Sequence, residues 1–370
     1  DNVRMKHFGN FIALLILAIN ALFTGLLLLV AYSPYIQPVT HPVQSCFGLT
    51  FPIFALINGA FLIFWLVIQR YKTALLPLIG FLLCYSQLRT YLPLNFHTAN
   101  PPEESIKFLS YNIMGFNGAV KKDGKNPILT YLKESNADIL CLQEYASAES
   151  PRRLTQKDIE RELKDYPYHR ISVVGSGSGY TNKIACYSKF PILSARVLNY
   201  PSGYNGSVLY ELKLNEDTIT LINNHLESNK LTKADKDIYE DILKAPEKEK
   251  VKSGARLLVH KLAEASAIRA PQADTIAREI ASSRYPSVIV CGDFNDTPIS
   301  YAHRVIAQNL DDAFTQSGRG LGISYNQNKF YFRIDNILIS KNLQSYNCTV
   351  DRSIKESDHY PIWCYIAKRQ

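Results

Sequence analysis

Two long runs without a charged residue dominate the first hundred positions of this chain. One run covers residues 8–31 and the other covers residues 46–68. A helix needs ~20 apolar residues to cross the ~30 Å hydrocarbon core of a bilayer, so both runs are long enough. The apolar core of a cleaved signal peptide usually has ~7–15 residues, which makes that alternative a poor fit to the first run. The sequence therefore predicts membrane-spanning helices.

A third, weaker candidate covers residues 74–94, where Arg89 interrupts the run and Pro77 and Pro93 flank it. A long basic side chain near a helix end can reach the polar interface, so Arg89 is compatible with a span. We expect three spans; the alternative is two spans followed by an interfacial segment. In both cases residues 1–96 are predicted to form a membrane anchor.

The orientation of the anchor follows from its basic residues, which favour the cytoplasmic side. They precede the first run and follow the second, as Arg4, Lys6, Arg70 and Lys72. The loop of residues 32–45 has neither lysine nor arginine. Three spans would make this an integral protein of the inner or plasma membrane, with everything after about residue 96 outside the cytoplasm. Two spans would leave the following domain in the cytoplasm.

Charge is segregated along the chain. The 41 Lys and Arg and the 33 Asp and Glu residues give a net charge of +8, of which +4 belongs to residues 101–370. That excess is too small for a strongly basic nucleic-acid clamp. Seven scattered cysteines without a CxxC pair predict buried free thiols. Residues 97–105, HTANPPEES, read as a linker to a domain of residues 106–370.

Short apolar runs alternate with turn signals after the linker. Strands are predicted at residues 106–113, 137–144, 168–174, 183–192, 207–214, 218–226, 287–295, 333–340 and 362–368. Helices are predicted at 126–136 and 269–284. Many strands with few helices favour an α/β fold of two packed sheets with helices outside. The charged stretch 227–267 is expected to be a solvated helical insertion or, alternatively, a lid over the site.

Polar residues follow several of the apolar runs. They are Asn112 in SYNI, Glu144 in LQE, His225 in NNHL, Asp293 and Asn295 in GDFND, Asp335 in RIDNI, and Asp358 and His359 in SDHYP. Each alone is explained by a turn, a cap or a core hydrogen bond. Together they suit metal-assisted attack of water on a phosphate ester. Oxygen ligands without cysteine indicate Mg²⁺ or Mn²⁺.

The ordered series SYN, LQE, NNHL, GDFND, RIDNI and SDHYP resembles the endonuclease/exonuclease/phosphatase superfamily. That superfamily includes deoxyribonuclease I-like nucleases, neutral sphingomyelinases and inositol-polyphosphate phosphatases. The resemblance covers roughly residues 106–368. It implies a four-layer α/β/β/α sandwich and a hydrolase that acts on phosphoric ester bonds with Mg²⁺ or Mn²⁺.

The resemblance also implies a metal site. Glu144 would be the principal ligand, with Asn112 beside it and Asp358 near the ion. The family's abasic-site endonucleases often carry an acid two places after the SYN asparagine, where this chain has Met114. That departure leaves open whether one or two metals bind.

The remaining motif residues would carry out the reaction. Asp293 would orient or deprotonate the attacking water, and Asn295 would hold the phosphate. His359 would be the general base or a phosphate contact, oriented by Asp335. His225 would contact the phosphate or protonate the leaving group.

Three residues outside these motifs also match family positions. Asn182 would face the phosphate or form only a turn. Arg269 and Gln272 match a recurrent Arg-x-x-Gln, which packing and capping explain better than catalysis.

The predicted function is a membrane-tethered, metal-dependent phosphodiesterase. Its substrate would be a nucleic acid or a phospholipid or sphingolipid. One alternative is a phosphomonoesterase of inositol-phosphate type, and another is a non-enzymatic membrane-bound binding module on a nuclease-like fold. The lipid bilayer is the expected partner, and no obligate protein partner is evident from the sequence.

Overall fold

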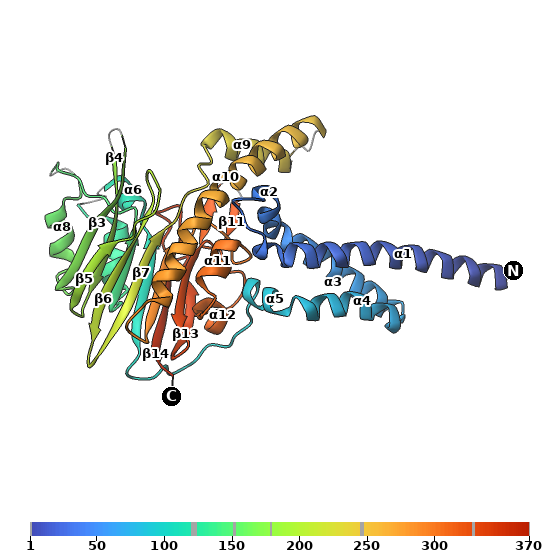
Figure 1. Cartoon of the computed structure of the whole chain (residues 1–370), viewed down its shortest axis with the longest axis horizontal. Helices are drawn as coiled ribbons and strands as arrows, with labels where there is room; N and C mark the ends of the chain where they lie inside the picture. The colour runs from blue at the N-terminus through green and yellow to red at the C-terminus, as the bar shows by residue number, and fades with distance from the viewer. Residues whose placement is uncertain are drawn as a thin grey trace.

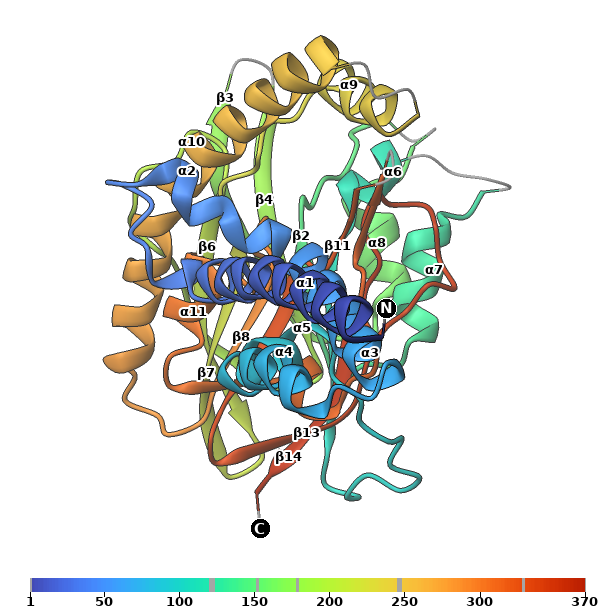
Figure 2. The same ribbon diagram turned by 90° about the vertical axis from the view of Figure 1, so that its right-hand side faces the viewer.

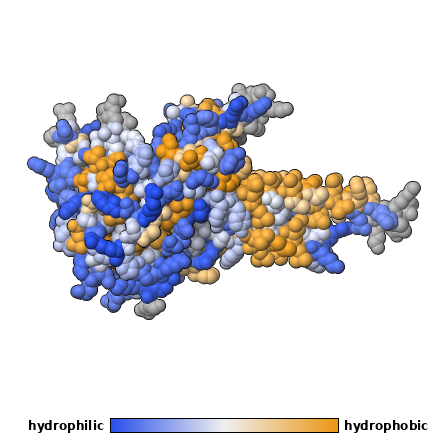
Figure 3. All heavy atoms as spheres, viewed as in Figure 1, coloured by the Kyte–Doolittle hydropathy of each residue, from blue (hydrophilic) through white to orange (hydrophobic). Residues whose placement is uncertain are grey.

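A helical bundle joined to an α/β sandwich makes up the protein in the computed structural model (Figure 1). The structure describes residues 2–119, 124–150, 153–177, 180–244, 248–327 and 330–369. The bundle projects from one side of the sandwich, and the N-terminus lies at its far end. The bundle surface in Figure 3 is almost continuously hydrophobic, whereas the sandwich surface is largely hydrophilic. The charge segregation of the sequence is therefore also a spatial one.

The uncharged runs of the sequence form the bundle. Its elements are α1 (Asn2–Ala31), η1 (Ser33–Tyr35), α2 (Pro42–Ser45), η2 (Cys46–Thr50), α3 (Phe51–Val67), α4 (Tyr71–Leu83) and α5 (Tyr85–Tyr91). Within the described part of the chain, two segments are long and apolar enough to cross a membrane, judged by length and composition: His7–Ala31 and Pro42–Val67. They coincide with the two stronger candidates from the sequence.

The third predicted span, residues 74–94, is divided into two helices. The 13 residues of α4 span ~20 Å, which is less than the ~30 Å hydrocarbon thickness. Cys84 leaves the helical region (φ −110°, ψ 24°) and separates α4 from α5. Pro77 lies buried inside α4. In Figure 1, α4 and α5 follow one another back toward the sandwich.

A chain of polar side chains joins α1 and α3 inside the bundle. Thr24 Oγ1 donates to Asn58 Oδ1 (2.8 Å), and Trp65 Nε1 donates to Asn20 Oδ1 (3.0 Å). Asn20 Nδ2 lies 3.3 Å from Thr24 Oγ1, which completes the chain. Polar groups in apolar surroundings are costly unless paired, so these contacts fix how the two helices face each other.

Two six-stranded sheets form the sandwich. The first has the order β13-β14-β1-β2-β4-β3, and its strands are β13 (Leu343–Val350), β14 (Ile362–Lys368), β1 (Ile106–Asn112), β2 (Ile139–Gln143), β4 (Tyr180–Ser188) and β3 (Tyr168–Gly177). The second has the order β5-β6-β7-β8-β12-β9, and its strands are β5 (Ile192–Val197), β6 (Gly206–Leu214), β7 (Asp217–His225), β8 (Val288–Asp293), β12 (Asp335–Ser340) and β9 (Leu310–Asp312). A separate hairpin pairs β10 (Tyr325–Gln327) with β11 (Phe330–Phe332).

Alternating side chains build the layers. On β1, Phe108 packs in the core between the sheets, while its neighbour Leu109 packs with the helices outside. The helices beside the first sheet are α6 (Met114–Ala119), α7 (Pro127–Glu134) and α8 (Gln156–Glu162). Those of the second are α10 (Lys248–Ala281) and α11 (Tyr301–Ile306), which pack against its outer face. α9 (Lys233–Lys244) packs on α10, and α12 (Ala313–Ser317) packs against β13 and β12, with Phe314 in the core between the sheets. The predicted four-layer α/β/β/α sandwich is confirmed.

Three local predictions differ from the structure. The predicted strand 183–192 is two strands of different sheets, because Pro191 interrupts it between β4 and β5. The helix expected at 269–284 begins much earlier, at Lys248, and continues through Pro271. The strand β13 was not predicted, since its sequence LQSYNCTV is polar and only half buried.

The charged insertion at 227–267 is a helical hairpin made by α9 and the first half of α10. Residues 245–247 of this insertion lie outside the described residues. All seven cysteines are free, as predicted; six of them are buried, whereas Cys46 is partly exposed.

The bundle packs directly against the sandwich. Figure 2 views the molecule from the bundle end and shows α10 and α11 beside the base of the bundle. A Cβ placed on Gly48 would lie 2.0 Å from the backbone oxygen of Ile299, so only glycine allows this approach. Arg304 Nε donates to the backbone oxygen of Pro34 (2.8 Å). Leu27 of α1 packs in one apolar cluster with Ile299. The two parts thus share a packed interface.

Candidate active site

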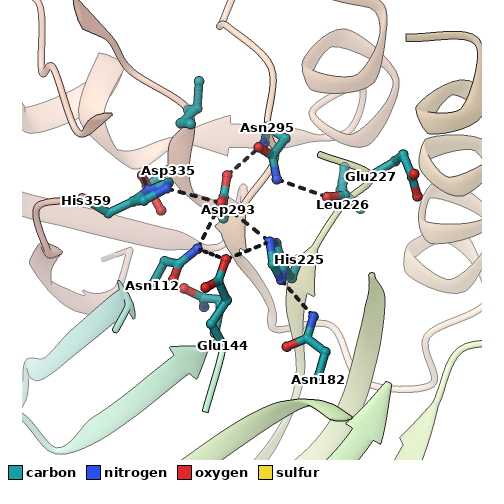
Figure 4. A network of polar contacts seen from close by, with 12 residues as sticks. Asn112, Glu144, Asn182, His225, Leu226, Glu227, Asp293, Asn295, Asp335 and His359 are labelled. Atoms are coloured by element: carbon teal, nitrogen blue, oxygen red, sulfur yellow. Dashed lines mark hydrogen bonds and ion pairs between the residues drawn. The ribbon is translucent and has the colours of Figure 1, made fainter. Parts of the chain in front are cut away.

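The site forms where strand ends of the two sheets meet. On the second sheet, Asp293 at the end of β8 pairs with His225 of β7 on one side and with Asp335 of β12 on the other. On the first sheet, β1 and β2 are parallel neighbours. Asn112 at the end of β1 therefore lies beside the end of β2, where Glu144 follows. Polar residues that follow apolar runs in the sequence are thus brought together at these strand ends (Figure 4).

Unusual backbone conformations place the residues that follow β2 and β8. Gly292 has φ +121°, and a Cβ there would lie 2.0 Å from the backbone oxygen of Asn224. Glu144 (φ 52°) and Asn295 (φ 51°) adopt left-handed conformations, which cost ~1–3 kcal/mol each in a non-glycine residue. Asn295 Nδ2 donates to the backbone oxygen of Leu226 (3.0 Å). The amide nitrogen expected to hold phosphate is thus engaged with the loop after β7.

Asp293 is the centre of the network. Its side chain is buried and accepts from Asn112 Nδ2 (3.1 Å) and from the backbone N–H of Asn295 (2.8 Å). Two imidazoles face its Oδ2 atom: His359 Nε2 at 3.5 Å and His225 Nε2 at 3.7 Å. The predicted catalytic residues therefore converge on one carboxylate.

His359 and Asp335 form a buried pair beside Asp293. His359 Nδ1 lies 2.8 Å from Asp335 Oδ2, and because a carboxylate only accepts, the Nδ1–H donates. Burial alone would lower the pKa of His359, but the charges of Asp335 and Asp293 raise that pKa well above its ordinary value. Burial raises the pKa of Asp293 to about 6, with His359 opposing the shift and Asp335 adding to it. At neutral pH, His359 is the protonated member of this group.

Asn182 fixes the second imidazole. Its Nδ2 donates to the backbone oxygen of Tyr204 (2.9 Å) and lies 3.2 Å from His225 Nδ1. Since Asn182 Nδ2 is a donor, His225 Nδ1 is the acceptor, and the proton of the neutral ring is on Nε2. His225 Nε2 lies 3.6 Å from Glu144 Oε1. Burial lowers the pKa of His225, against the charge of Asp293. Asn182, a predicted substrate contact, thus lies beside the ring nitrogen of His225 that faces away from Asp293.

The three predicted metal ligands, Asn112, Glu144 and Asp358, lie near one another at the cavity over the site. Asn112 Nδ2 donates to Glu144 Oε1 (3.2 Å), so the amide presents its nitrogen to the carboxylate. A role as a metal ligand requires Asn112 Oδ1 to face the ion. Asp358 lines the same cavity as Glu144. Burial raises the pKa of Glu144; the hydrogen bond from Asn112 opposes the shift, and the charge of Asp358 adds to it.

The acids of the site suit a cation. In the described part of the chain, the ion pairs of Glu144, Asp293 and Asp335 involve histidine but neither lysine nor arginine. Asp335 Oδ1 is buried without a hydrogen-bond partner. One ligand atom each from Asp293, Asp335 and His359 lie within 4.8 Å of one another. Buried negative charge that lacks a basic partner is costly, and a hard divalent ion bound by oxygen would offset that cost.

Arg269 and Gln272 hold the loops behind the site. Arg269 Nη1 donates to the backbone oxygen of Glu227 (2.9 Å), and its Nε lies 3.2 Å from Asp296 Oδ2. Gln272 Oε1 accepts from the backbone N–H of Glu227 (2.9 Å). These contacts join the segment after β7 to the segment after β8, which agrees with the structural role favoured by the sequence.

Two residues of the site were not singled out from the sequence. Ser357 Oγ donates to the backbone oxygen of Asn112 (2.7 Å) and accepts from the backbone N–H of His359 (3.2 Å). Its position inside the SDHYP motif was an available signal. The ring of Tyr325 lies edge-on to His359, with centroids 5.1 Å apart. Tyr325 belongs to the short strand β10, which carries no motif.

A cavity of about 240 Å³ opens over the cluster. Glu144, Asp293 and His359 line one part of it, while Cys46 and Leu49 of the anchor line another. The sequence offered no reason to connect the anchor with the site, because these two residues lie inside an apolar run.

The motif order, the fold and this convergence agree with a sequence comparison. The profile of the "Endonuclease/Exonuclease/phosphatase family" matches residues 109–359. The chain belongs to this family. Its members are generally hydrolases that act on phosphoester bonds. A second profile, described as a domain of unknown function (DUF8431), matches residues 13–91. No curated protein sequence matches the chain.

Solved structures share the fold at low sequence identity. The endonuclease/exonuclease/phosphatase from Beutenbergia cavernae is 14% identical, with a TM-score of 0.51 over 71% of this chain and 72% of that chain. The human nocturnin catalytic domain with bound sulfate is 15% identical, with a TM-score of 0.49 over 75% of this chain and 97% of that one. D. rerio TDP2 complexed with a single-strand DNA product is 17% identical, with a TM-score of 0.47 over 71% and 99%.

Proposed function

We propose that this family member is a membrane-tethered, divalent-metal-dependent phosphodiesterase. The observation that carries the proposal is the buried cluster of Asp293, Asp335 and His359 beside Glu144, in which acids from both sheets have no basic partner other than histidine among the described residues. This arrangement suits a reaction on an anionic ester with a bound cation.

Glu144 and Asn112 would hold the metal, with Asp358 at the same mouth, and Mg²⁺ or Mn²⁺ fits their oxygen atoms. When bound, the ion would supply positive charge that stabilises the phosphoryl oxygens in the transition state. The two imidazoles would add to this charge. His225 would donate from Nε2, and the protonated His359 would contact an oxygen of the phosphoryl group.

Asp293 would accept the proton of the attacking water. A pKa of about 6 leaves this carboxyl ionised at neutral pH, yet close enough to neutrality to act as a general base. The water oxygen forms a bond to phosphorus, and the bond from phosphorus to the ester oxygen breaks. The imidazolium of His359 would donate its proton to the released ester oxygen. The products are a phosphate monoester and an alcohol.

The anchor would place this chemistry outside the cytoplasm. α1 leads from the far end of the bundle to the sandwich, α3 leads away from it, and α4 and α5 return (Figure 1). Arg70, which follows α3, donates to Asn10 Oδ1 of α1 (3.0 Å), so both segments meet at that end. Basic residues favour the cytoplasmic side. Three passes, with α4 and α5 together as the third, would then put the sandwich on the opposite side, whereas two passes would leave it in the cytoplasm.

A substrate panel tests the activity. The full chain, reconstituted in lipid nanodiscs with Mg²⁺, is offered single-stranded DNA, RNA, sphingomyelin and an inositol phosphate, alongside the Asp293→Asn variant. We expect the wild-type chain to hydrolyse at least one phosphodiester and the variant to lose that activity. Equal behaviour of the two proteins on every substrate would refute the proposal. Preference for the inositol phosphate would favour the monoesterase alternative.

A further inference from the structure

The cavity over the candidate active site has both polar and apolar lining. The polar lining includes the carboxylates and imidazoles described above, together with Arg269 and Asp296. Six apolar side chains also line the cavity and are called here the apolar lobe: Leu49, Leu231, Leu262, Ile299, Phe330 and Phe332. The volume of about 240 Å³ is below the ~300–1,000 Å³ typical of ligand pockets, so it holds a small polar group and a limited length of chain.

Three distant parts of the sequence build the apolar lobe. Leu49 comes from η2 of the anchor, Leu262 from α10 of the helical hairpin, and Phe330 from the β10–β11 hairpin. Contacts between these parts join the walls of the lobe to one another. Ser45 Oγ of the anchor lies 3.3 Å from Ser266 Oγ of α10, and the Tyr239 ring of α9 lies 4.2 Å from that of Phe330.

The basic residues that line the cavity are engaged by internal partners. Lys230 Nζ lies 2.7 Å from Glu227 Oε1, and Lys236 Nζ donates to Tyr325 Oη (2.5 Å). The third, Arg269, is held by Asp296. A nucleic-acid strand presents a phosphate at every nucleotide and is bound through unpaired basic side chains and stacking. The cavity lining therefore suits a hydrocarbon chain better than a nucleic-acid backbone with several phosphates.

The position of the lobe matches a chain that comes from the bilayer. Leu49 lies in the 3₁₀ turn that leads into α3, inside Pro42–Val67, which is one of the two segments long and apolar enough to span. In Figure 3 the hydrophobic surface of the bundle begins directly beside the sandwich. A hydrocarbon chain that entered from lipid beside Leu49 would keep its apolar surface covered, which is favourable.

We propose that the substrate is an amphiphilic phosphoester whose phosphoryl group binds at the carboxylate–imidazole cluster and whose hydrocarbon chain occupies the apolar lobe. This inference rests on the proposed function and names its substrate class. Hydrolysis adds water across the phosphorus–oxygen ester bond, as derived above, and releases an alcohol and a phosphate monoester, one of which carries the chain.

Alkyl 4-nitrophenyl phosphate diesters test the inference. The full chain in nanodiscs with Mg²⁺ is offered methyl, butyl and octyl esters, and release of 4-nitrophenol is measured. We expect kcat/KM to rise about fourfold for each methylene that enters the lobe, the factor that corresponds to ~0.8 kcal/mol per buried CH₂. Equal kcat/KM for the methyl and octyl esters would overturn the amphiphile assignment and leave the phosphodiesterase proposal intact.

Matched leucine variants locate the effect. Leu262→Ser, inside the lobe, should flatten the dependence on chain length, whereas Leu257→Ser on an exposed turn of the same helix should retain it. Partition of the esters into the nanodisc is the same for both variants. Leu49→Ser provides a second lobe variant, on the anchor side. An unchanged chain-length slope in both lobe variants would contradict the assignment.

Two further measurements separate failure of the lobe from failure of the activity. Calorimetric titration with butyl and octyl phosphate reports chain binding without turnover, and octyl phosphate should bind more tightly to wild type than to Leu262→Ser. Chain-dependent binding without hydrolysis of any ester would refute the enzyme and retain the lobe. A single-stranded oligonucleotide hydrolysed with a higher kcat/KM than the octyl ester would overturn the substrate class.

Discussion

His359 Nδ1 and Asp335 Oδ2 lie 2.8 Å apart in a buried pair, while Nε2 of the same ring faces Asp293 at 3.5 Å. Asp335 thus fixes both the orientation of the imidazole and which nitrogen carries its proton. It is a positioning residue, because it acts on the reaction through His359.

Replacing Asp335 by asparagine should shift the pH dependence of activity. Asp335 helps to raise the pKa of His359, so the protonated ring persists to higher pH in the wild type. With a neutral amide in place of the carboxylate, that pKa falls, and the alkaline limb of the pH–kcat profile should move to lower pH. A kcat that drops with no movement of this limb would indicate a purely structural role.

Asp293→Asn should lower kcat by roughly 10²–10⁴-fold, the range that general acid–base groups contribute. The side chain keeps its shape and loses its capacity to accept a proton from water. Asp217→Asn, at the exposed start of β7, is the matched control and should keep wild-type turnover. Near-wild-type activity of Asp293→Asn would remove Asp293 from the mechanism. Circular dichroism checks that both variants are folded.

Chelation should abolish hydrolysis, and Mg²⁺ or Mn²⁺ should restore it. Glu144→Gln should raise the metal concentration needed for half-maximal activity, because the amide removes a negative charge from the mouth of the site. Glu216→Gln, on an exposed turn, is the control and should behave as wild type. Activity that persists after exhaustive treatment with EDTA would contradict the metal requirement.

Reporter fusions check the orientation of the anchor. Fusions after residue 100 should score outside the cytoplasm, and fusions after residue 69 should score inside, as the basic residues near that position imply. A cytoplasmic score after residue 100 would mean that α4 and α5 do not together return the chain across the bilayer.

Much of the candidate site could be predicted from the sequence because its residues follow apolar runs. His225 and Asp293 end two strands, and parallel pairing of those strands brings them side by side. The same logic placed Asn112 near Glu144. Period-two patterns and strand ends are local properties of the sequence, so they can be recognised without knowledge of the fold.

Contacts between distant elements could not be predicted in this way. Asn182 looked like a residue that faces phosphate, and only the structure shows its amide on the far nitrogen of His225. Leu49 lies in an apolar run that membrane burial already explained. Its place in the wall of the cavity depends on how the bundle docks, which no local pattern encodes. The break at Cys84 was hidden for the same reason, because the residues before it form an apolar run.

The tight approach of Gly48 to Ile299 has a consequence for how this protein is handled. A soluble fragment that starts at the linker would lack Leu49 and would open the pocket to water on that side. Under the proposed function, the kinetics of that fragment would lack the contribution of this wall to substrate binding. A foreign transmembrane helix grafted in front of the linker would not supply the wall either.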